Sequence, residues 1–190
     1  MSGVLAEDFV ELLESLKNDT HAFDLFAILR RIDALNRNNP PLGKTLRPRN
    51  DLIRLGQKPS SLFAPSSLAN LERDRSGRPA KLSIYGFGLF GPNGPMPLVM
   101  TEYIRERAEL YGDRGLIEFF DLFHHRLISL FYRAWAQAQP TNCLDRPETD
   151  AFSRYIASLL GVHGASGENG VSPHALLFYA GHLSRQVRNP

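Results

Sequence analysis

The amino-acid sequence predicts an α+β protein that is mostly helical. Apolar residues recur with the 3.6-residue period of a helix near both ends of the chain, whereas this period disappears between residues 45 and 97. In that middle stretch, short apolar pieces are separated by clusters of Pro, Ser and Gly, as in a small sheet with long connections. We therefore expect N-terminal helices over 1–43, a β-rich and loop-rich region over 44–98, and a helical region over 99–190.

Two helices are expected in the first region. The first is predicted by an apolar stripe at helical spacing, formed by Leu5, Phe9, Leu12, Leu13 and Leu16. The second begins near Phe23, and its apolar face is too broad for a narrow seam. We therefore expect this second helix to be covered on more than one side. The segment 36–41 should end it, because its two prolines cannot continue a helix.

The middle region offers three apolar pieces, at 52–55, 61–64 and 81–90, as the source of a small sheet. Residues 86–97 read GFGLFGPNGPMP and hold four glycines and three prolines, which predicts a stiff loop rich in turns. This loop carries apolar side chains. It either presents them to a partner or folds back on the protein's own core.

The C-terminal region is expected to begin with a helix over 99–111 and a long helix over 113–139, which Pro140 stops. Apolar residues occupy a wide arc of the long helix, so it should be buried on several sides or contribute to assembly where it faces outward. The arc includes Phe119, Phe123, Leu127, Phe131 and Trp135. Two shorter helices should follow, at 147–160 and about 173–185.

The basic charge of the chain is local. The segment 44–81 holds nine Lys or Arg residues and three acidic residues, although the whole chain has a formal net charge of only +2. Such a segment is a solvated basic face, a surface for an acidic protein partner, or a nucleic-acid surface. Nucleic acid ranks third, because Phe63 is its only aromatic residue and stacking needs aromatic rings.

Two arrangements of residues would suit chemistry. Cys143 with His124 or His125 would be the nucleophile and base of a cysteine hydrolase, but the sequence near this lone cysteine supplies no oxyanion hole. Glu118 and Asp121 join the two histidines as possible metal ligands, yet adjacent histidines diverge by about 100° around a helix. We expect a polar stripe there, with no catalytic residue, cofactor or metal.

The sequence favours a cytoplasmic protein. A single cysteine cannot form an internal disulfide, which fits a reducing compartment. The N-terminus is too acidic for a signal peptide, and no apolar run reaches the roughly 18 residues of a spanning helix. We therefore expect no direct insertion into a membrane.

Four segments together resemble the TssG family, also called ImpH or VasB, of baseplate subunits in the bacterial type VI secretion system. They read FDLFAILRRIDALN at 23–36, LRPRNDLIRLGQKPSSLFAPSSLANLE at 46–72, GLFGPNGPMPLVMTEYIRER at 88–107 and FFDLFHHRLISLFYRAWAQAQP at 119–140. The resemblance covers nearly the whole chain in order. Family members continue beyond the point that matches 176–190, so the resemblance implies the N-terminal portion of such a subunit.

The resemblance implies a structural wedge component rather than an enzyme, with helical bundle elements and a small β-rich, foot-like insertion. Its implied partners are two copies of TssF, trimers of TssK, the sheath-linked TssE and the central spike hub, with no nucleic acid. The implied location is the baseplate docked at the inner membrane of a Gram-negative bacterium. Candidate contact residues come from the loop (Leu89, Phe90, Pro92, Asn93 and Met96) and from the long helix (Phe119, Phe123, Leu127, Phe131 and Trp135).

Overall fold

A computed structural model describes residues 2–37, 39–45, 47–73, 79–146, 150–159, 172, 175, 178–179 and 181–182. Its contacts divide the chain into two compact units, residues 1–138 and 139–190. The first unit combines helices with a three-stranded sheet, and the described part of the second is helical. The predicted class, α+β and mostly helical, is confirmed. The division of the chain into the three regions named above remains a prediction.

The first unit opens with two helices, as predicted. Helix α1 spans Ser2–Asn18, and a 3-10 turn η1 at Thr20–Ala22 leads to helix α2 at Leu25–Leu35. The Asp24 carboxylate caps α2 because it accepts the free backbone N–H groups of Phe26 and Ala27, at 2.9 and 3.2 Å. This cap starts the helix two residues after the position expected from the apolar pattern.

The sheet has the order β1-β3-β2. Strands β1 (Ile53–Gln57) and β3 (Ala80–Ile84) are parallel, whereas β2 (Leu68–Glu72) is antiparallel to β3 on its other side. The short 3-10 turn η2 at Pro48–Asn50 precedes β1. The last strand in the sequence therefore lies between the other two, which leaves β1 and β2 as the edges of the sheet.

The two faces of the sheet differ in chemistry, since neighbouring side chains of a strand point to opposite faces. One face carries buried aliphatic residues such as Leu55 and Leu82, and it shares one core with apolar residues of α1, α2 and α4. The opposite face carries Lys81, Ser83 and Glu72, among others. The helical half of the core is made of Leu12, Leu13, Leu16, Leu25, Ile28, Leu29, Ile32, Ile128, Tyr132 and Ala136.

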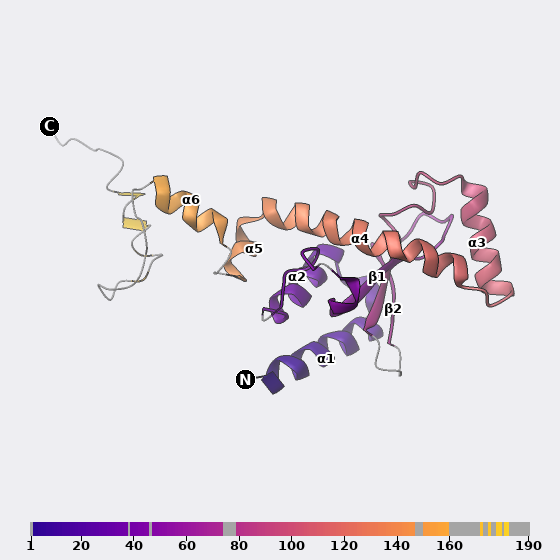
Figure 1. The fold of residues 1–190 in the computed structure, drawn as a ribbon, viewed down its shortest axis with the longest axis horizontal. Helices are drawn as coiled ribbons and strands as arrows, with labels where there is room; N and C mark the ends of the chain where they lie inside the picture. The colour runs from indigo at the N-terminus through magenta and orange to yellow at the C-terminus, as the bar shows by residue number, and fades with distance from the viewer. Residues whose placement is uncertain are drawn as a thin grey trace. The chain divides into compact units, whose positions relative to one another are not determined.

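Helix α3 (Leu98–Leu110) and the long helix α4 (Gly115–Ala138) complete the first unit, close to the bounds predicted from the sequence. Figure 1 shows α4 running past β1, with α1 and α2 beneath it and α3 beside its N-terminal end. A second, smaller core joins the loop to both helices through Phe90, Ile104 and Ile117.

The second unit contains helices α5 (Pro140–Leu144) and α6 (Ala151–Leu159). The helix predicted over 147–160 corresponds to α6, whereas α5 differs from the prediction, because Pro140 begins a helix as well as ending α4. Proline in fact suits the first turn of a helix, where its missing N–H costs nothing. Most of the helix predicted over 173–185 lies outside the described residues.

One expectation about the sheet was wrong in detail. The piece 61–64 is an exposed connection, and the missing strand is β2 at Leu68–Glu72. Leu62 and Phe63 are 73% and 90% exposed, so their apolar character does not reflect burial in a sheet. The alternation in LANLE was too short a pattern to distinguish a strand from a turn.

Candidate partner-binding site

Helix α4 is apolar on its outer surface and carries polar groups on the side that meets the sheet. The polar groups of this side lie mainly at 121–125, whereas further along the helix the buried side is apolar, with Ile128, Tyr132 and Ala136. The inward side buries His124 and His125, which are 0% and 5% exposed. The outward side exposes phenylalanine and leucine. The polar side is held by hydrogen bonds to the sheet, and the apolar side is exposed.

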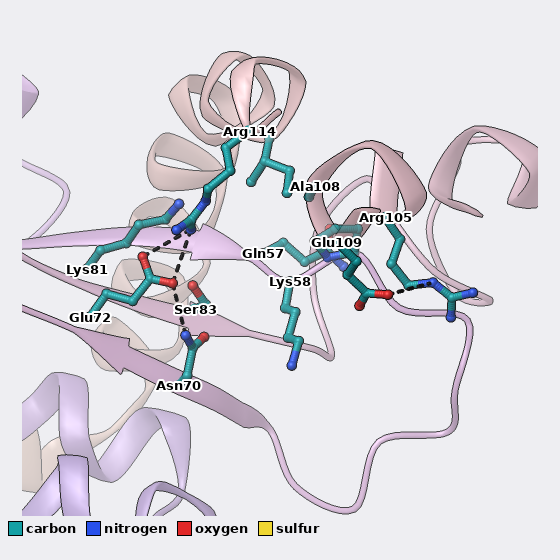
Figure 2. Close-up of a pocket in the computed structure, with 12 residues that line it drawn as sticks. Gln57, Lys58, Asn70, Glu72, Lys81, Ser83, Arg105, Ala108, Glu109 and Arg114 are labelled. Carbon is teal, nitrogen blue, oxygen red and sulfur yellow. Dashed lines mark hydrogen bonds and ion pairs between the residues drawn. The ribbon is translucent and has the colours of Figure 1, made fainter. Parts of the chain in front are cut away.

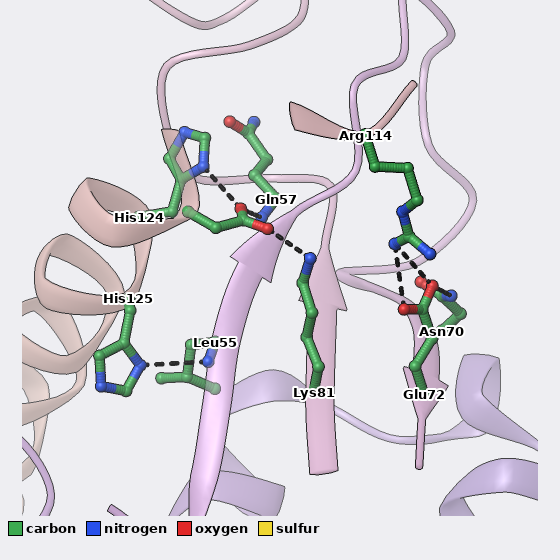
Figure 3. Close-up of polar contacts among 9 residues, drawn as sticks. Leu55, Gln57, Asn70, Glu72, Lys81, Arg114, His124 and His125 are labelled. Carbon is green, nitrogen blue, oxygen red and sulfur yellow. Dashed lines mark hydrogen bonds and ion pairs between the residues drawn. The ribbon is translucent and has the colours of Figure 1, made fainter. Parts of the chain in front are cut away.

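The polar side of α4 completes the free edge of β1. The backbone N–H groups of Leu55 and Gln57 point out of the sheet and donate to side chains of α4. Leu55 donates to His125 Nδ1 and Gln57 to Asp121 Oδ1, both at 3.1 Å. Figure 3 shows the bond between Leu55 and His125. Side chains thereby replace the neighbouring strand that an exposed edge would otherwise recruit.

The spacing of these two acceptors matches the spacing of the two donors. Asp121 and His125 are four residues apart on a helix, which is about 6 Å along its axis. Leu55 and Gln57 are two residues apart on a strand, which is about 6.6 Å. One helical turn therefore spans one pair of outward-facing N–H groups, with α4 running antiparallel to β1. We call these four residues the edge clamp.

The hydrogen bonds of the two buried histidines fix opposite tautomers. His125 accepts at Nδ1, so its proton is on Nε2, which donates to Asp51 Oδ2 at 2.9 Å. His124 accepts the N–H of Leu89 at Nε2, 3.1 Å, so its proton is on Nδ1, which donates to Asp121 Oδ1. All four ring nitrogens are in use, and neither imidazole has a free lone pair to act as a base.

Electrostatics favours the same protonation states. Burial lowers the pKa of the His125 imidazole, and this effect outweighs the opposing influence of Asp51. Burial works against ionisation of Asp121, but hydrogen bonds from His124 and Lys81 outweigh it, so the pKa of this carboxyl lies below its usual value. The clamp is therefore made of a neutral imidazole and a carboxylate that also forms an ion pair with Lys81.

Gly56 lets α4 approach the strand this closely. A Cβ atom at this position would lie 2.8 Å from both carboxylate oxygens of Asp121 and 2.8 Å from Cε of Lys81. Only a residue without a side chain leaves room for that ion pair against the middle of β1.

The same helix side anchors the loop 86–97. Besides the bond from Leu89 to His124, the buried Gln57 side chain donates to the carbonyls of Tyr85 and Phe90 and accepts the N–H of Phe90 at 2.8 Å. The Phe90 ring is 2% exposed and packs edge-on against Phe120 and His124. The loop thus folds back on the core, and Phe90 belongs to that core rather than to a contact surface.

The remaining candidates of the loop differ in exposure. Pro92 and Asn93 are exposed at its tip, whereas Leu89 and Met96 are half-buried, and Met96 packs against the smaller core. The loop candidates available to a partner are therefore mainly the two tip residues.

The outward side of α4 carries a continuous apolar stripe. Its members are spaced by three or four residues, so their side chains adjoin along one face. We call it the outer stripe; it consists of Leu116, Phe119, Phe123, Leu127 and Leu130, with exposed fractions of 37%, 53%, 52%, 39% and 39%. Of the sequence candidates it includes Phe119, Phe123 and Leu127. Leu116 and Leu130 stood in the same apolar arc of the sequence but were not named as contacts.

Phe131 and Trp135 pack mainly against other aromatic side chains of the first unit. Phe131 stacks on Phe87 with ring centroids 4.3 Å apart, and Trp135 stacks on Phe26 at 4.8 Å. Phe26 also meets Phe131 at 5.3 Å. This aromatic chain ties α4 to α2 and to the start of the loop, although Phe131 remains 40% exposed.

The metal site considered from the sequence is not assembled among the described residues. No group of three or more His, Cys, Asp or Glu is placed there to hold a metal ion. Cys143 is a free, half-buried cysteine of the second unit. None of the described helices is long and apolar enough to span a bilayer.

A broad exposed apolar stripe on a rigid helix is typical of a subunit that binds other proteins. The family model for TssG of type VI secretion matches residues 19–190. The chain belongs to this family, and it is a component of the type VI secretion baseplate. No match was found among curated proteins or among solved structures.

We predict that His125→Ala destabilises the protein by about 2 to 4 kcal/mol, because it leaves the buried Leu55 N–H without its acceptor and removes one of the two hydrogen bonds to the Asp51 carboxylate. Urea unfolding followed by circular dichroism measures the change. His21→Ala is the matched control: His21 is exposed and, within the part of the chain that the structure describes, its side chain bonds only the Ser66 hydroxyl, so its loss should cost less than about 0.5 kcal/mol. Equal effects of the two variants would contradict the clamp.

Stability should fall on mild acidification. The folded-state pKa of His125 lies below its ordinary 6.5, so the unfolded chain binds this proton first. The free energy of unfolding is therefore greatest above about pH 6.5 and decreases as pH falls toward the folded-state value. Of the charged groups that act on this imidazole, Asp51 raises its pKa, whereas Arg54 and Arg126 lower it. In His125→Ala the slope between pH 6.5 and 5 should be shallower; an unchanged slope would refute the assignment.

Gly56→Ala is expected to cost about 1 to 3 kcal/mol, since the added methyl group must displace the Asp121–Lys81 ion pair or the backbone of β1. The control is Gly86→Ala, where no atom lies within 4 Å of the added methyl group. Thermal unfolding of both variants makes the comparison. A Gly56→Ala protein as stable as Gly86→Ala would show that the close approach of α4 is not required.

Proposed function

We propose that this chain is a structural wedge component of the type VI secretion baseplate, and that it joins partner subunits without performing bond chemistry. Membership of the TssG family supports the baseplate role. The observation that carries the proposal is the outer stripe, which exposes five large apolar side chains on one face of α4, the longest of the described helices. Covering such a stripe provides binding energy in proportion to the apolar area removed from water.

We assign the outer stripe to TssF, of which two copies are the expected partners. A helix face with i, i+3 and i+4 anchors is suited to packing beside another helix in a bundle. Phe119 and Phe123 are the strongest anchors, because aromatic side chains dominate the binding energy of many interfaces. A convincing interface would bury at least about 1,000 Å² in total.

We assign the loop tip to TssK. Pro92 and Asn93 are exposed, while the bonds from Gln57 and His124 hold the base of the loop. The N–H of Gly91 also donates to Thr101 Oγ1 at the start of α3, 3.2 Å. A tip held on both sides loses little conformational entropy on binding. TssE and the spike hub complete the proposed set of partners, and the proposed location is the cytoplasmic face of the inner membrane in a Gram-negative bacterium.

The cysteine hydrolase using Cys143 is not favoured by the geometry. His124 and His125 each use both ring nitrogens in hydrogen bonds within the first unit, so neither is free to deprotonate a thiol. The nucleic-acid alternative depends on the basic segment 44–81. Within it Lys81 is paired with Asp121, and the segment offers Phe63 as its single aromatic ring for stacking.

Co-purification of the full chain with TssF and TssK tests both assignments at once. Phe119→Asp/Phe123→Asp should reduce recovery of TssF by about tenfold or more while TssK is retained, because two charges enter an apolar interface. Asn93→Arg should reduce recovery of TssK while TssF is retained. Phe63→Asp, on the exposed connection before β2, is the control for adding a charge at an exposed aromatic position. Unchanged TssF recovery with the stripe variant would overturn the proposal.

A further inference from the structure

A cationic cavity borders α4 beside the outer stripe. It has a volume of about 460 Å³ and lies between the turn at 43–45 and the helix. Three cations line it, Lys44, Arg126 and Arg133, against one carboxylate, that of Asp51. The volume falls in the range of about 300 to 1,000 Å³ that is usual for ligand sites, so the cavity can admit more than a single small ion.

The cations of this cavity are largely uncompensated. Arg126 donates to the backbone carbonyl of Gly43 at 3.2 Å, which holds the guanidinium at the wall but leaves its charge unpaired. Among the described residues, the side chains of Lys44 and Arg133 have no hydrogen bond or ion pair. The Asp51 carboxylate is already occupied, because it accepts from Thr45 Oγ1 at 2.7 Å and from His125 Nε2.

A second cavity on the first unit provides the contrast. It has a volume of about 220 Å³ and lies over the polar face of the sheet, next to α3 (Figure 2). Both of its arginines have a carboxylate partner in the lining: Arg114 forms two hydrogen bonds with Glu72, at 3.1 and 3.0 Å, and Arg105 pairs with Glu109. Among the described residues, the arginines of the cationic cavity therefore differ from those of the second cavity in having no carboxylate partner.

The cationic cavity is continuous with the outer stripe along the helix. Arg126 lies three residues after Phe123 and four before Leu130, and Arg133 lies three after Leu130, so these side chains are neighbours on the helix surface. The two arginines are seven residues apart, about 10.5 Å along α4. A partner segment that covers the stripe will place one flank over both guanidinium groups.

We propose that this cavity receives carboxylate side chains from an acidic flank of the protein segment that covers the outer stripe. Guanidinium groups bind carboxylates bidentately, and a carboxylate entering this cavity would compensate charges that are now unpaired. A nucleic acid is a poorer match: the cavity has no aromatic ring to stack a base except the His125 imidazole, which is held on both nitrogens. The inference rests on the proposed function, since the stripe must be covered by another subunit.

The test with a defined probe uses the full chain and a fluorescein-labelled deca-glutamate peptide, followed by fluorescence anisotropy at low salt. Lys44→Gln/Arg133→Gln removes two cavity charges without breaking a side-chain hydrogen bond or ion pair to a described residue, and it should weaken binding by about fivefold or more. Lys17→Gln/Arg31→Gln removes the same charges from exposed positions of α1 and α2 and should weaken it by less than about twofold. No binding, or equal losses in both double variants, would overturn the inference.

Inorganic phosphate separates a site for protein carboxylates from a site for free oxyanions. At equal ionic strength, phosphate should displace the peptide no better than chloride does. Much stronger displacement by phosphate would assign the cavity to a free oxyanion and overturn the inference. Co-purification with the subunit that binds the stripe separates this inference from the proposed function. Loss with Phe119→Asp/Phe123→Asp but full retention with Lys44→Gln/Arg133→Gln would leave the function standing and refute the cavity's role.

Discussion

The first unit depends on the contact between the free edge of β1 and the polar side of α4. Two backbone N–H groups of the strand find acceptors one helical turn apart, in Asp121 and His125. A three-stranded sheet with an open edge would be a site for unwanted pairing. Because α4 supplies acceptors instead of another strand, the β1 edge of the sheet is covered without a further strand. This contact requires glycine at position 56, because a Cβ atom there would lie too close to Asp121 and Lys81.

The clamp explains why the apolar residues of α4 are distributed as they are. A helix that turns histidine and aspartate toward a sheet has fewer inward positions for leucine and phenylalanine. Ile128 and Tyr132 fill the core beyond the clamp, while Phe119 and Phe123 remain outside. The outer stripe is therefore not an ordinary surface with scattered apolar residues. It is a second apolar face, and the cationic cavity beside it gives that face a charge preference.

Much of the architecture could be predicted from the sequence, because long periodic segments such as 113–139 and punctuating prolines are strong signals. The roles within α4 could not. The arc from Phe119 to Trp135 reads as one surface, yet Trp135 stacks on Phe26 while Phe123 is half exposed, and only the tertiary contacts decide this. The histidines were expected to be part of a polar stripe. Their role as acceptors for a strand edge needs the position of β1, which lies some 70 residues earlier in the chain.

The central claim is that α4 holds the sheet with its polar side so that its apolar side is left for another subunit. Site-specific photo-crosslinking in assembled baseplates tests it most directly, with a benzophenone side chain at Phe123 and, as a reference, at the exposed Ala27 of α2. The account predicts a crosslink from position 123 to a different baseplate subunit and a much weaker one from position 27. A position 123 that crosslinks to nothing, or only to its own chain, would contradict it.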